Sequence, residues 1–466
     1  MNPALQLAIA ATGATLLDGE TAPPTLRVST DTRTIEPGDT FVALRGERFD
    51  GHDFTGEAAR RGAALLIVDR PEARAGGTAT LLVGDTKAAY MALAGAAREL
   101  FKGRVVAITG SAGKTTTKVL LAQLLAVAYG DRVLSAPENE NNEIGVSKLI
   151  LRASNDAHEV LVVEMGARHF GDIAALVEIA RPHLGILTNV GEAHLEIMGS
   201  RERLEETKWG LFSGGARAVL NAADAVSRRR ASTLARPPHW FAAGRTALRS
   251  VDFEMTPLTA IIGDRVVHRS PAIKAERHLD LVERNVDVRL PGMHNRANLA
   301  AALAAALELG LSLDQILPAI PSLTLPSGRY DRLAVGSGAQ LIYDAYNANA
   351  SATIAALDAF AGESASRRIA VLASMAELGE ESAALHERVG AHAACRVDVL
   401  LVRGEHAAEL ARGAQQAGLA PERIVEIETN AQAARWLREH MRPDDVVLLK
   451  GSRKYKLEEI VEELRT

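Results

Sequence analysis

The stretch VVAITGSAGKTTTK, residues 105–118, constrains the fold of this chain more than any other segment. A short apolar run at 105–108 predicts a buried strand, and helical periodicity over 116–126 predicts a helix after a loop that contains glycines. Glycines let backbone N–H groups crowd around an anion, and the N-terminus of a helix adds partial positive charge. The stretch is therefore predicted to bind phosphate, most simply that of a nucleoside triphosphate. The loop residues expected to do so are Gly110, Ser111, Ala112, Gly113, Lys114, Thr115 and Thr116.

The loop differs at one position from the general phosphate-loop pattern GxxxxGK[ST]. Lys114 is placed to reach the outer phosphates and the Thr115 hydroxyl to suit Mg²⁺, but Ile108 stands where the pattern has its first glycine. An accidental Gly-Lys-Thr in an ordinary strand-to-helix turn is the alternative. The flanking strand and helix favour phosphate binding, and the missing glycine then indicates a particular subgroup.

Length and composition indicate an enzyme-like chain of several domains. The 466 residues are enough for about three domains. A net charge of −5 argues against a nucleic-acid surface. The single cysteine, Cys395, cannot form an internal disulfide; it lies in an Ala-rich run and is expected to be buried. The N-terminal segment lacks a basic region, and no run of 18 apolar residues occurs, so we expect neither export nor a membrane span but a cytoplasmic location.

The first 102 residues are expected to form a small α/β domain. The segment STDTRTIEPGDTFVALRGERFDGHDF is rich in loop formers and offers Thr30, Asp31, Thr32 and Arg33 as hydrogen-bonding groups. These four residues either bind a polar ligand or form a solvated loop. The expected elements are helices at 4–11 and 54–61 and strands at 26–29, 40–44 and 64–68.

A second domain is expected at residues 103–323, with polar residues at its strand ends. The predicted strand at 159–163 delivers Glu164 to its carboxyl end, where ligands of open α/β sheets collect. Glu164 is thus either an Mg²⁺ ligand or a solvated carboxylate. The strand at 183–188 puts Asn189 and His194 on another strand-end loop, although a lone histidine is more often a structural hydrogen-bonding residue.

Further candidates in the second domain lie on predicted turns and helices. Lys208 falls in a predicted helix at 201–212 and reads, by itself, as an exposed lysine that extends past an apolar face. Asn295 and Asn298 lie one turn apart on an Ala/Leu-rich helix, so their amides either contact an adenine edge together or are capping or solvated groups. The remaining candidates, which form a polar turn or hold a carbonyl-rich substrate, are Asn139, Asn141 and Asn142.

Residues 324–466 alternate between strand and helix patterns and predict a Rossmann-like, doubly wound and mostly parallel sheet. The sheet lacks GxGxxG, which disfavours a dinucleotide site. Polar residues gather at its strand ends and outline a binding face. These residues are Asp344, Tyr346, Asn347, Asn349, Glu377, Lys450, Ser452 and Arg453. The fold class predicted for the whole chain is α/β in three domains, with the triphosphate site in the central one.

Eight ordered motifs resemble those of the Mur ligase family, the ATP-dependent amide-forming enzymes of bacterial cell-wall synthesis. They cover essentially the whole chain and are TGSAGKTTTK, EMGA, NVGEAHLE, TKWGLF, GMHNRAN, SGRYDRL, DAYNAN and KGSR. The first-domain segment, NENNEIG, DAYNAN and MAELG are similar to the branch that joins D-alanyl-D-alanine to UDP-N-acetylmuramoyl-tripeptide through an acyl phosphate. The DNPR-type motif of the diamino-acid-adding branch is not found. A diamino-acid-adding ligase and a regulatory P-loop NTPase are the alternatives.

The resemblance also implies roles for residues at matching positions, ATP and Mg²⁺ as cofactors, no nucleic-acid partner, a monomer, and closure of the third domain onto the second. Lys208 matches a lysine that is typically carbamylated and bridges metals. Catalytic roles fall on Lys114, Lys208, His194 and Glu164. Mg²⁺ contacts fall on Thr115, Glu164, His194 and Lys208. ATP contacts fall on the phosphate loop, Asn295, Asn298, Arg329 and Asp344. Substrate contacts fall on Thr30, Asp31, Thr32, Arg33, Asn139, Asn141, Asn142, Tyr346, Asn347, Asn349, Lys450, Ser452 and Arg453.

Overall fold

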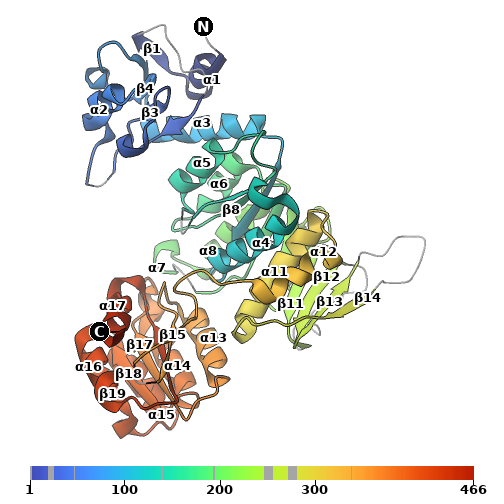
Figure 1. Cartoon of the computed structure of the whole chain (residues 1–466), viewed down its shortest axis with the longest axis vertical. Coiled ribbons are helices and arrows are strands. Elements are labelled where there is room, and N and C mark those ends of the chain that lie inside the picture. The colour runs from blue at the N-terminus through green and yellow to red at the C-terminus, as the bar shows by residue number, and fades with distance from the viewer. Residues whose placement is uncertain are drawn as a thin grey trace.

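The computed structural model consists of three α/β units that follow one another along the chain (Figure 1). It describes residues 3–18, 26–46, 48–137, 140–192, 195–245, 256–270, 281–336 and 338–465. In Figure 1 the blue N-terminal unit and the red C-terminal unit lie at opposite ends of the green-to-yellow middle unit. The predicted fold class, α/β with mostly parallel sheets, is confirmed.

The first unit is a five-stranded sheet in the order β1-β5-β4-β3-β2, in which only β1 runs antiparallel to its neighbour. On its last helix, Arg98 donates from its guanidinium to the carbonyl oxygens of Ala180 and Arg181 at 2.7 and 3.0 Å, which joins the first unit to the middle one. The strands are β1 (Thr15–Asp18), β2 (Val28–Ser29), β3 (Thr40–Val42), β4 (Leu65–Val68) and β5 (Ala79–Leu82), and the helices are α1 (Pro3–Thr12), α2 (Thr55–Arg60) and α3 (Thr86–Leu100).

The middle unit contains a nine-stranded sheet in the order β14-β13-β12-β11-β10-β9-β6-β8-β7. Strand β13 is antiparallel to both neighbours, and every other pairing is parallel. The strands are β6 (Arg104–Thr109), β7 (Val133–Ser135), β8 (Val160–Glu164), β9 (Leu184–Leu187), β10 (Arg217–Asn221), β11 (His239–Ala243), β12 (Leu258–Ile262), β13 (Arg265–Arg269) and β14 (Leu281–Asn285). The helices are α4 (Lys114–Tyr129), α5 (Glu143–Leu151), α6 (Asp172–Ala180), α7 (Leu195–Met198), α8 (Arg201–Trp209), α9 (Ala225–Arg230), α11 (Gly292–Glu308) and α12 (Leu313–Ile316).

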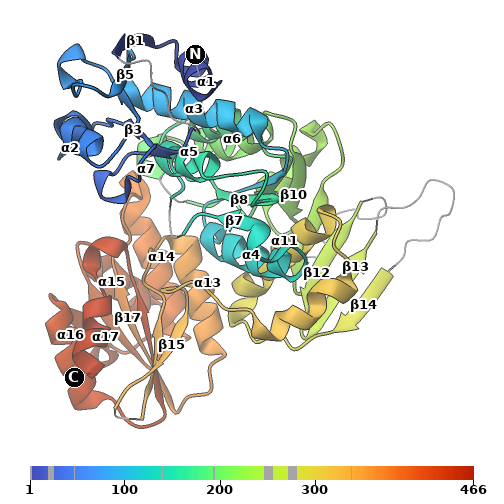
Figure 2. The same cartoon turned by 45° about the horizontal axis from the view of Figure 1, so that its top comes forward.

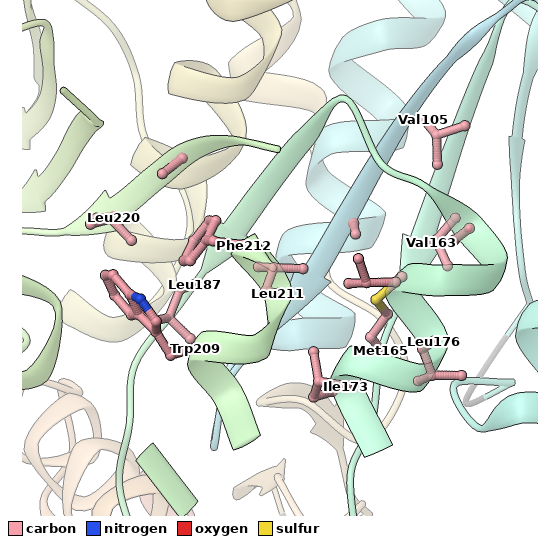
Figure 3. Packing of buried hydrophobic residues seen from close by; sticks show 14 of the residues in the cluster. Val105, Val163, Met165, Ile173, Leu176, Leu187, Trp209, Leu211, Phe212 and Leu220 are labelled. Atoms are coloured by element: carbon pink, nitrogen blue, oxygen red, sulfur yellow. The ribbon is translucent and has the colours of Figure 1, made fainter. Parts of the chain in front are cut away.

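Strand β6 is central in this sheet, between β9 and β8, and both of its faces are covered. Figure 3 shows one side, where Val105 packs in a cluster with Val163 and Leu176. On the other side α4 and α11 supply Leu120, Leu303 and a run of buried alanines. A strand buried on two faces is apolar throughout instead of alternating, and this explains the sequence VVAI before the glycine loop.

The third unit is a six-stranded sheet in the order β15-β16-β20-β17-β18-β19, parallel except for the edge strand β15. Helices cover both faces, as the alternating pattern predicted. The strands are β15 (Asp331–Ala334), β16 (Gln340–Tyr343), β17 (Arg367–Ala373), β18 (Val399–Arg403), β19 (Ile424–Ile427) and β20 (Asp445–Lys450), and the helices are α13 (Ala350–Ala361), α14 (Ser382–Ala394), α15 (Ala407–Gln416), α16 (Asn430–His440) and α17 (Glu458–Arg465).

The expected burial of Cys395 is wrong. Cys395 is exposed and not buried, because it follows α14 on a side away from the buried Leu385, Val389 and Ala393. Within the described ranges, no helix has both the length and the apolar character needed to cross a membrane.

Candidate functional site

The glycine loop between β6 and α4 has a shape that only glycine tolerates at two positions. Gly113 has φ of 82°, and a Cβ there would lie 2.4 Å from Asn298 Oδ1. Gly110 has φ of 148°, and a Cβ there would lie 1.9 Å from Thr188 Oγ1. Lys114 begins α4 and donates from Nζ to the Gly110 carbonyl oxygen at 2.9 Å. Substitution at either glycine would therefore force the loop or its neighbours to move.

Asn189, at the end of β9, holds the loop from outside. Its carbonyl oxygen accepts from Ser111 N at 3.0 Å, and its amide side chain both accepts from Ala112 N and donates to the Ala112 carbonyl, each at 3.1 Å. The donors that remain for an anion are the first-turn amides of α4, which have no intrahelical acceptor. The sequence placed Asn189 on a strand-end loop but gave it no role, so this contact was missed.

Glu164, at the end of β8, is buried beside the loop with 2% of its surface exposed. Its Oε1 accepts from Thr115 Oγ1 at 3.1 Å and from Asn141 Nδ2 at 2.9 Å. Its Oε2 has no hydrogen-bond donor and faces Lys118 Nζ at 3.4 Å. The alternative of a solvated carboxylate is therefore excluded.

The donor set around Glu164 suits a hard divalent cation. A buried carboxylate oxygen without a hydrogen bond, next to a threonine hydroxyl, is the kind of ligand pair that Mg²⁺ takes together with phosphate oxygens. In the described part of the chain, no group of three or more His, Cys, Asp or Glu side chains is assembled for a metal. The predicted ligand His194 lies outside the described residues.

Lys208 lies on α8 with only 1% of its surface exposed, so the prediction of an exposed lysine is wrong. Burial lowers the pKa of its amine to about 7; the positive charge of Lys114 contributes to the lowering, and Asp172 opposes it. A large fraction of the amine is therefore neutral near pH 7. A neutral lysine amine is a nucleophile, whereas an ammonium ion is not.

The two asparagines on α11 lie against the glycine loop. Asn295 and Asn298 are 3% and 8% exposed, which excludes the solvated alternative. Asn298 Nδ2 donates to Asn295 Oδ1 at 3.4 Å, and its Oδ1 accepts from Thr117 Oγ1 at 3.4 Å. The pair thus lies beside Gly113, where the loop enters α4.

The third unit reaches the loop through an arginine and an asparagine. Arg329 donates from Nη2 to Thr115 Oγ1 at 3.3 Å, and its guanidinium lies 4.6 Å from the ring centre of Tyr346. Asn349 Nδ2 donates to the Ser111 carbonyl at 3.4 Å. Burial lowers the pKa of Lys114; the Glu164 carboxylate opposes this lowering, and the Arg329 charge adds to it. Residues from two units therefore share one electrostatic environment.

Asp344 and Lys450 shape the segment DAYNAN. Lys450 forms an ion pair with Asp344 Oδ2 at 3.0 Å and donates to the carbonyl oxygens of Asp344 and Asn347 at 3.0 and 3.2 Å. Lys450 is 3% exposed, so its amine is committed to these three contacts.

The other predicted substrate residues have local partners. Asp31 pairs with Arg33 at 2.6 Å, and hydrogen bonds from Arg33 lower the pKa of Asp31 to about 2. Asn142 caps α5 by accepting from Gly145 N at 2.9 Å. Thr30 and Thr32 lie on the same first-unit segment as Asp31 and Arg33. In the third unit, the Ser452 hydroxyl accepts a hydrogen bond from Ala376 N, and the exposed Arg453 forms an ion pair with Glu458. Asn139 lies outside the described residues. The structure thus brings the phosphate loop, Asn141, Glu164, Asn295, Asn298, Arg329 and Asn349 together.

Comparisons with known proteins cover almost the whole chain. Residues 27–96 match the Mur ligase family catalytic domain, residues 108–306 the Mur ligase middle domain, and residues 328–453 the Mur ligase glutamate ligase domain. The chain is 38% identical to the UDP-N-acetylmuramoyl-tripeptide–D-alanyl-D-alanine ligase of Synechocystis sp. over 78% of its length and 76% of that protein.

Two solved structures are similar throughout. A crystal structure of MurF from Acinetobacter baumannii matches with a TM-score of 0.82 at 27% identity, over 99% of this chain and 98% of that one. MurF ligase from Thermotoga maritima, in complex with ADP, matches with a TM-score of 0.77 at 29% identity, over 94% of this chain and 97% of that one.

Proposed function

The chain belongs to the Mur ligase family, and we propose that it joins D-alanyl-D-alanine to UDP-N-acetylmuramoyl-tripeptide, using ATP, in the synthesis of peptidoglycan precursors. In this reaction the tripeptide carboxylate takes the γ-phosphoryl group of ATP to form an acyl phosphate. The amine of D-alanyl-D-alanine then attacks the acyl carbon, an amide bond forms, and phosphate leaves. We assign this ligase reaction to three domains, at residues 1–102, 103–323 and 324–466.

The observation that carries the proposal is the environment of the Thr115 hydroxyl. It donates to the strand-end carboxylate Glu164 and accepts from Arg329 of the third unit. A phosphate loop, a candidate metal-binding carboxylate and a cation from another unit thus meet at one side chain. Phosphoryl transfer depends mostly on positioning and on neutralising charge, and this arrangement suits both.

We assign the triphosphate to the loop and the adenine to the α11 asparagines. Lys114 and the first-turn amides of α4 would hold the phosphates, where the helix N-terminus adds partial positive charge. Asn295 and Asn298 present amide groups that suit an adenine edge, and Arg329 and Asp344 would complete the nucleotide site from the third unit.

Thr115, Glu164, His194 and Lys208 are the residues that we assign to Mg²⁺. The cation would supply charge neutralisation at the phosphates. Because the Lys208 amine is buried and partly neutral at pH 7, it can take up CO₂ as a carbamate, which is an anionic oxygen ligand. The proposal for this residue therefore needs a lysine amine with a lowered pKa, and Lys208 has one.

The first unit is assigned to the UDP-muramoyl part of the substrate and the third to the acceptor. Thr30 to Arg33, Asn139, Asn141 and Asn142 are the candidates on the donor side. Tyr346, Asn347, Asn349, Lys450, Ser452 and Arg453 are those on the acceptor side, where Lys450 would act by holding the DAYNAN segment in shape. We also propose that the protein is a cytoplasmic monomer.

The experiment combines purified chain, ATP, Mg²⁺ and UDP-N-acetylmuramoyl-tripeptide and measures phosphate release with and without D-alanyl-D-alanine. We expect release to depend on the dipeptide, with a product heavier by one dipeptide less water in the mass spectrum. Lys114→Met should abolish release, whereas Lys102→Met, at an exposed lysine, should not. ATP hydrolysis at the same rate with and without every acceptor would refute the proposal and indicate an NTPase. Addition of a diamino acid to the dipeptide precursor would instead assign the chain to another branch of the family.

A further inference from the structure

Besides its contacts with the glycine loop, the third unit contacts the segment that joins β9 to α8, described at residues 189–192 and 195–201, which includes α7 (Figure 2). Glu192, Glu196 and Arg201 of this segment make these contacts. Glu196 N donates to the Glu377 carbonyl at 3.4 Å, and Arg201 forms an ion pair with Glu381 at 2.6 Å. The same segment begins with Asn189, which holds the glycine loop.

Glu192 makes the most extensive of these contacts. Its Oε2 accepts from Ser351 Oγ at 2.6 Å, and its Oε1 accepts from Arg388 Nη2 at 3.1 Å. Ser351 lies in the first turn of α13 and Arg388 on α14, so one carboxylate joins two helices of the third unit. The Glu192 side chain is 12% exposed, whereas the Arg201–Glu381 pair is 55% and 41% exposed. Arg388 is 47% exposed, so solvent also screens the first pair, but its Glu192 end is less exposed than either end of the second pair.

The electrostatics favour a charged Glu192. Its carboxylate accepts from the Ser351 hydroxyl and from the cationic guanidinium of Arg388. The carboxylate also lies beside the N-terminal turn of α13, where the helix contributes partial positive charge. The contact is thus an ionised, partly buried link between the two units.

The glycine loop is connected to this link through Gly191. Gly191 N donates to Ser111 Oγ at 2.9 Å, and a Cβ on Gly191 would lie 3.2 Å from Ser351 Oγ and 3.6 Å from Ser111 Cβ. From the other side, Asn349, which caps α13, donates to the Ser111 carbonyl at 3.4 Å. The start of α13, the Gly191–Glu192 backbone and the phosphate loop are therefore packed in direct succession.

We propose that Glu192 is a positioning residue that couples docking of the third unit to the phosphate loop: its hydrogen bonds with Ser351 and Arg388 hold α13 and α14 beside the backbone that contacts Ser111. Glu192 touches neither phosphate nor metal in this assignment. It raises the population of the docked arrangement, so a nucleotide that binds between the units binds more tightly. A test of this role by steady-state kinetics rests on the proposed function, whereas a test by distance measurement needs only a bound nucleotide.

Steady-state kinetics with D-alanyl-D-alanine test the first part. Apparent affinity falls with the fraction of molecules in the competent state, so Glu192→Ala should raise KM for ATP about tenfold and leave kcat within about twofold. Glu192→Gln, which keeps an acceptor for Ser351 but loses the charge, should restore part of the affinity. Glu387→Gln, on α14 next to Arg388 but paired with Arg412 inside the third unit, is the matched control and should match wild type. A fall in kcat at unchanged KM, or no change, would overturn the proposal.

Arg388→Gln tests the same contact from the other side and serves if Glu192→Ala does not fold. It should raise KM by less than Glu192→Ala does, because the hydrogen bond from Ser351 to Glu192 remains. The double variant should be no worse than Glu192→Ala alone, because that variant has already lost the contact with Arg388. Additive effects would overturn the proposal.

A distance measurement tests docking without the ligase reaction. Cys395 is the only native cysteine and is exposed, so Ala223→Cys in the exposed turn after β10 completes a spin-label pair across the two units. We expect Glu192→Ala to need about tenfold more non-hydrolysable ATP analogue than wild type to reach the short distance. An unchanged midpoint would overturn the coupling. If wild type closes but forms no amide, the proposed function fails while this inference remains testable.

Discussion

Replacement of Lys208 by methionine should stabilise the protein and remove a specific pH dependence. In the folded chain the buried amine has a pKa of about 7, against 10.5 for an ordinary lysine. Between these two values the unfolded chain binds more protons than the folded one, so the stability of the wild type rises with pH in that window. Lys208→Met keeps a side chain of similar length in the same buried position and has no proton to lose.

The magnitude follows from the size of the shift. A shift of about 3.5 units corresponds to about 5 kcal/mol at 1.36 kcal/mol per unit. At pH 7.5 about 4 kcal/mol of this remains, and Lys208→Met should be more stable than wild type by up to that amount. The difference should shrink by up to about 1.4 kcal/mol per pH unit and approach zero near pH 10.5.

The assay is urea unfolding in bicarbonate-free buffer at several pH values, followed by tryptophan fluorescence. A Trp436→Phe background leaves Trp209 and Trp240, both in the middle unit, so the signal reports the part that contains Lys208. Lys102→Met, at an exposed position, is the control and should show no such slope. A Lys208→Met protein that is no more stable than wild type, or a difference that does not vary with pH, would refute the reasoning.

Three further outcomes are expected. Gly113→Ala should weaken ADP binding by more than about tenfold and cost about 1–2 kcal/mol of stability for the left-handed backbone alone, measured by calorimetry and urea unfolding. Gly130→Ala, at the other end of α4 with no atom within 4 Å of its Cβ, should cost stability without affecting ADP binding. Glu164→Gln should abolish Mg²⁺-dependent turnover and lower stability by about 3 kcal/mol, because Lys118 is left buried beside a neutral group. Arg98→Met should lower the melting temperature, because three carbonyl oxygens lose their donor, and differential scanning calorimetry should show the first unit unfolding apart from the second.

Local sequence pattern was sufficient for much of the third unit. The predicted alternation is seen in elements such as β16, α14 and α16, because each is a short periodic segment between clear breakers. Strands β1 and β5 and helix α3 of the first unit were not predicted. The strand β1 is half exposed and pairs only at an edge, so its pattern is weak.

Sequence predicted the residues of the candidate site correctly only where they belong to a single local motif. The glycine loop and Glu164 follow from strand-loop patterns, since the carboxyl ends of β6 and β8 are neighbours. The burial of Lys208 did not follow, because the sequence shows only a polar helix and not the elements that pack on it. The contacts of Asn189 and Glu192 depend on loop packing between distant segments, which local pattern does not encode.

The hydrogen bonds between Asn189 and the phosphate loop have an energetic consequence for ligand binding. Ordering a backbone residue costs about 1–2 kcal/mol, and here that cost is met during folding by bonds to Ser111 and Ala112. An incoming triphosphate therefore meets a receptor that is already preorganised, and its own interactions go into affinity instead of into shaping the loop.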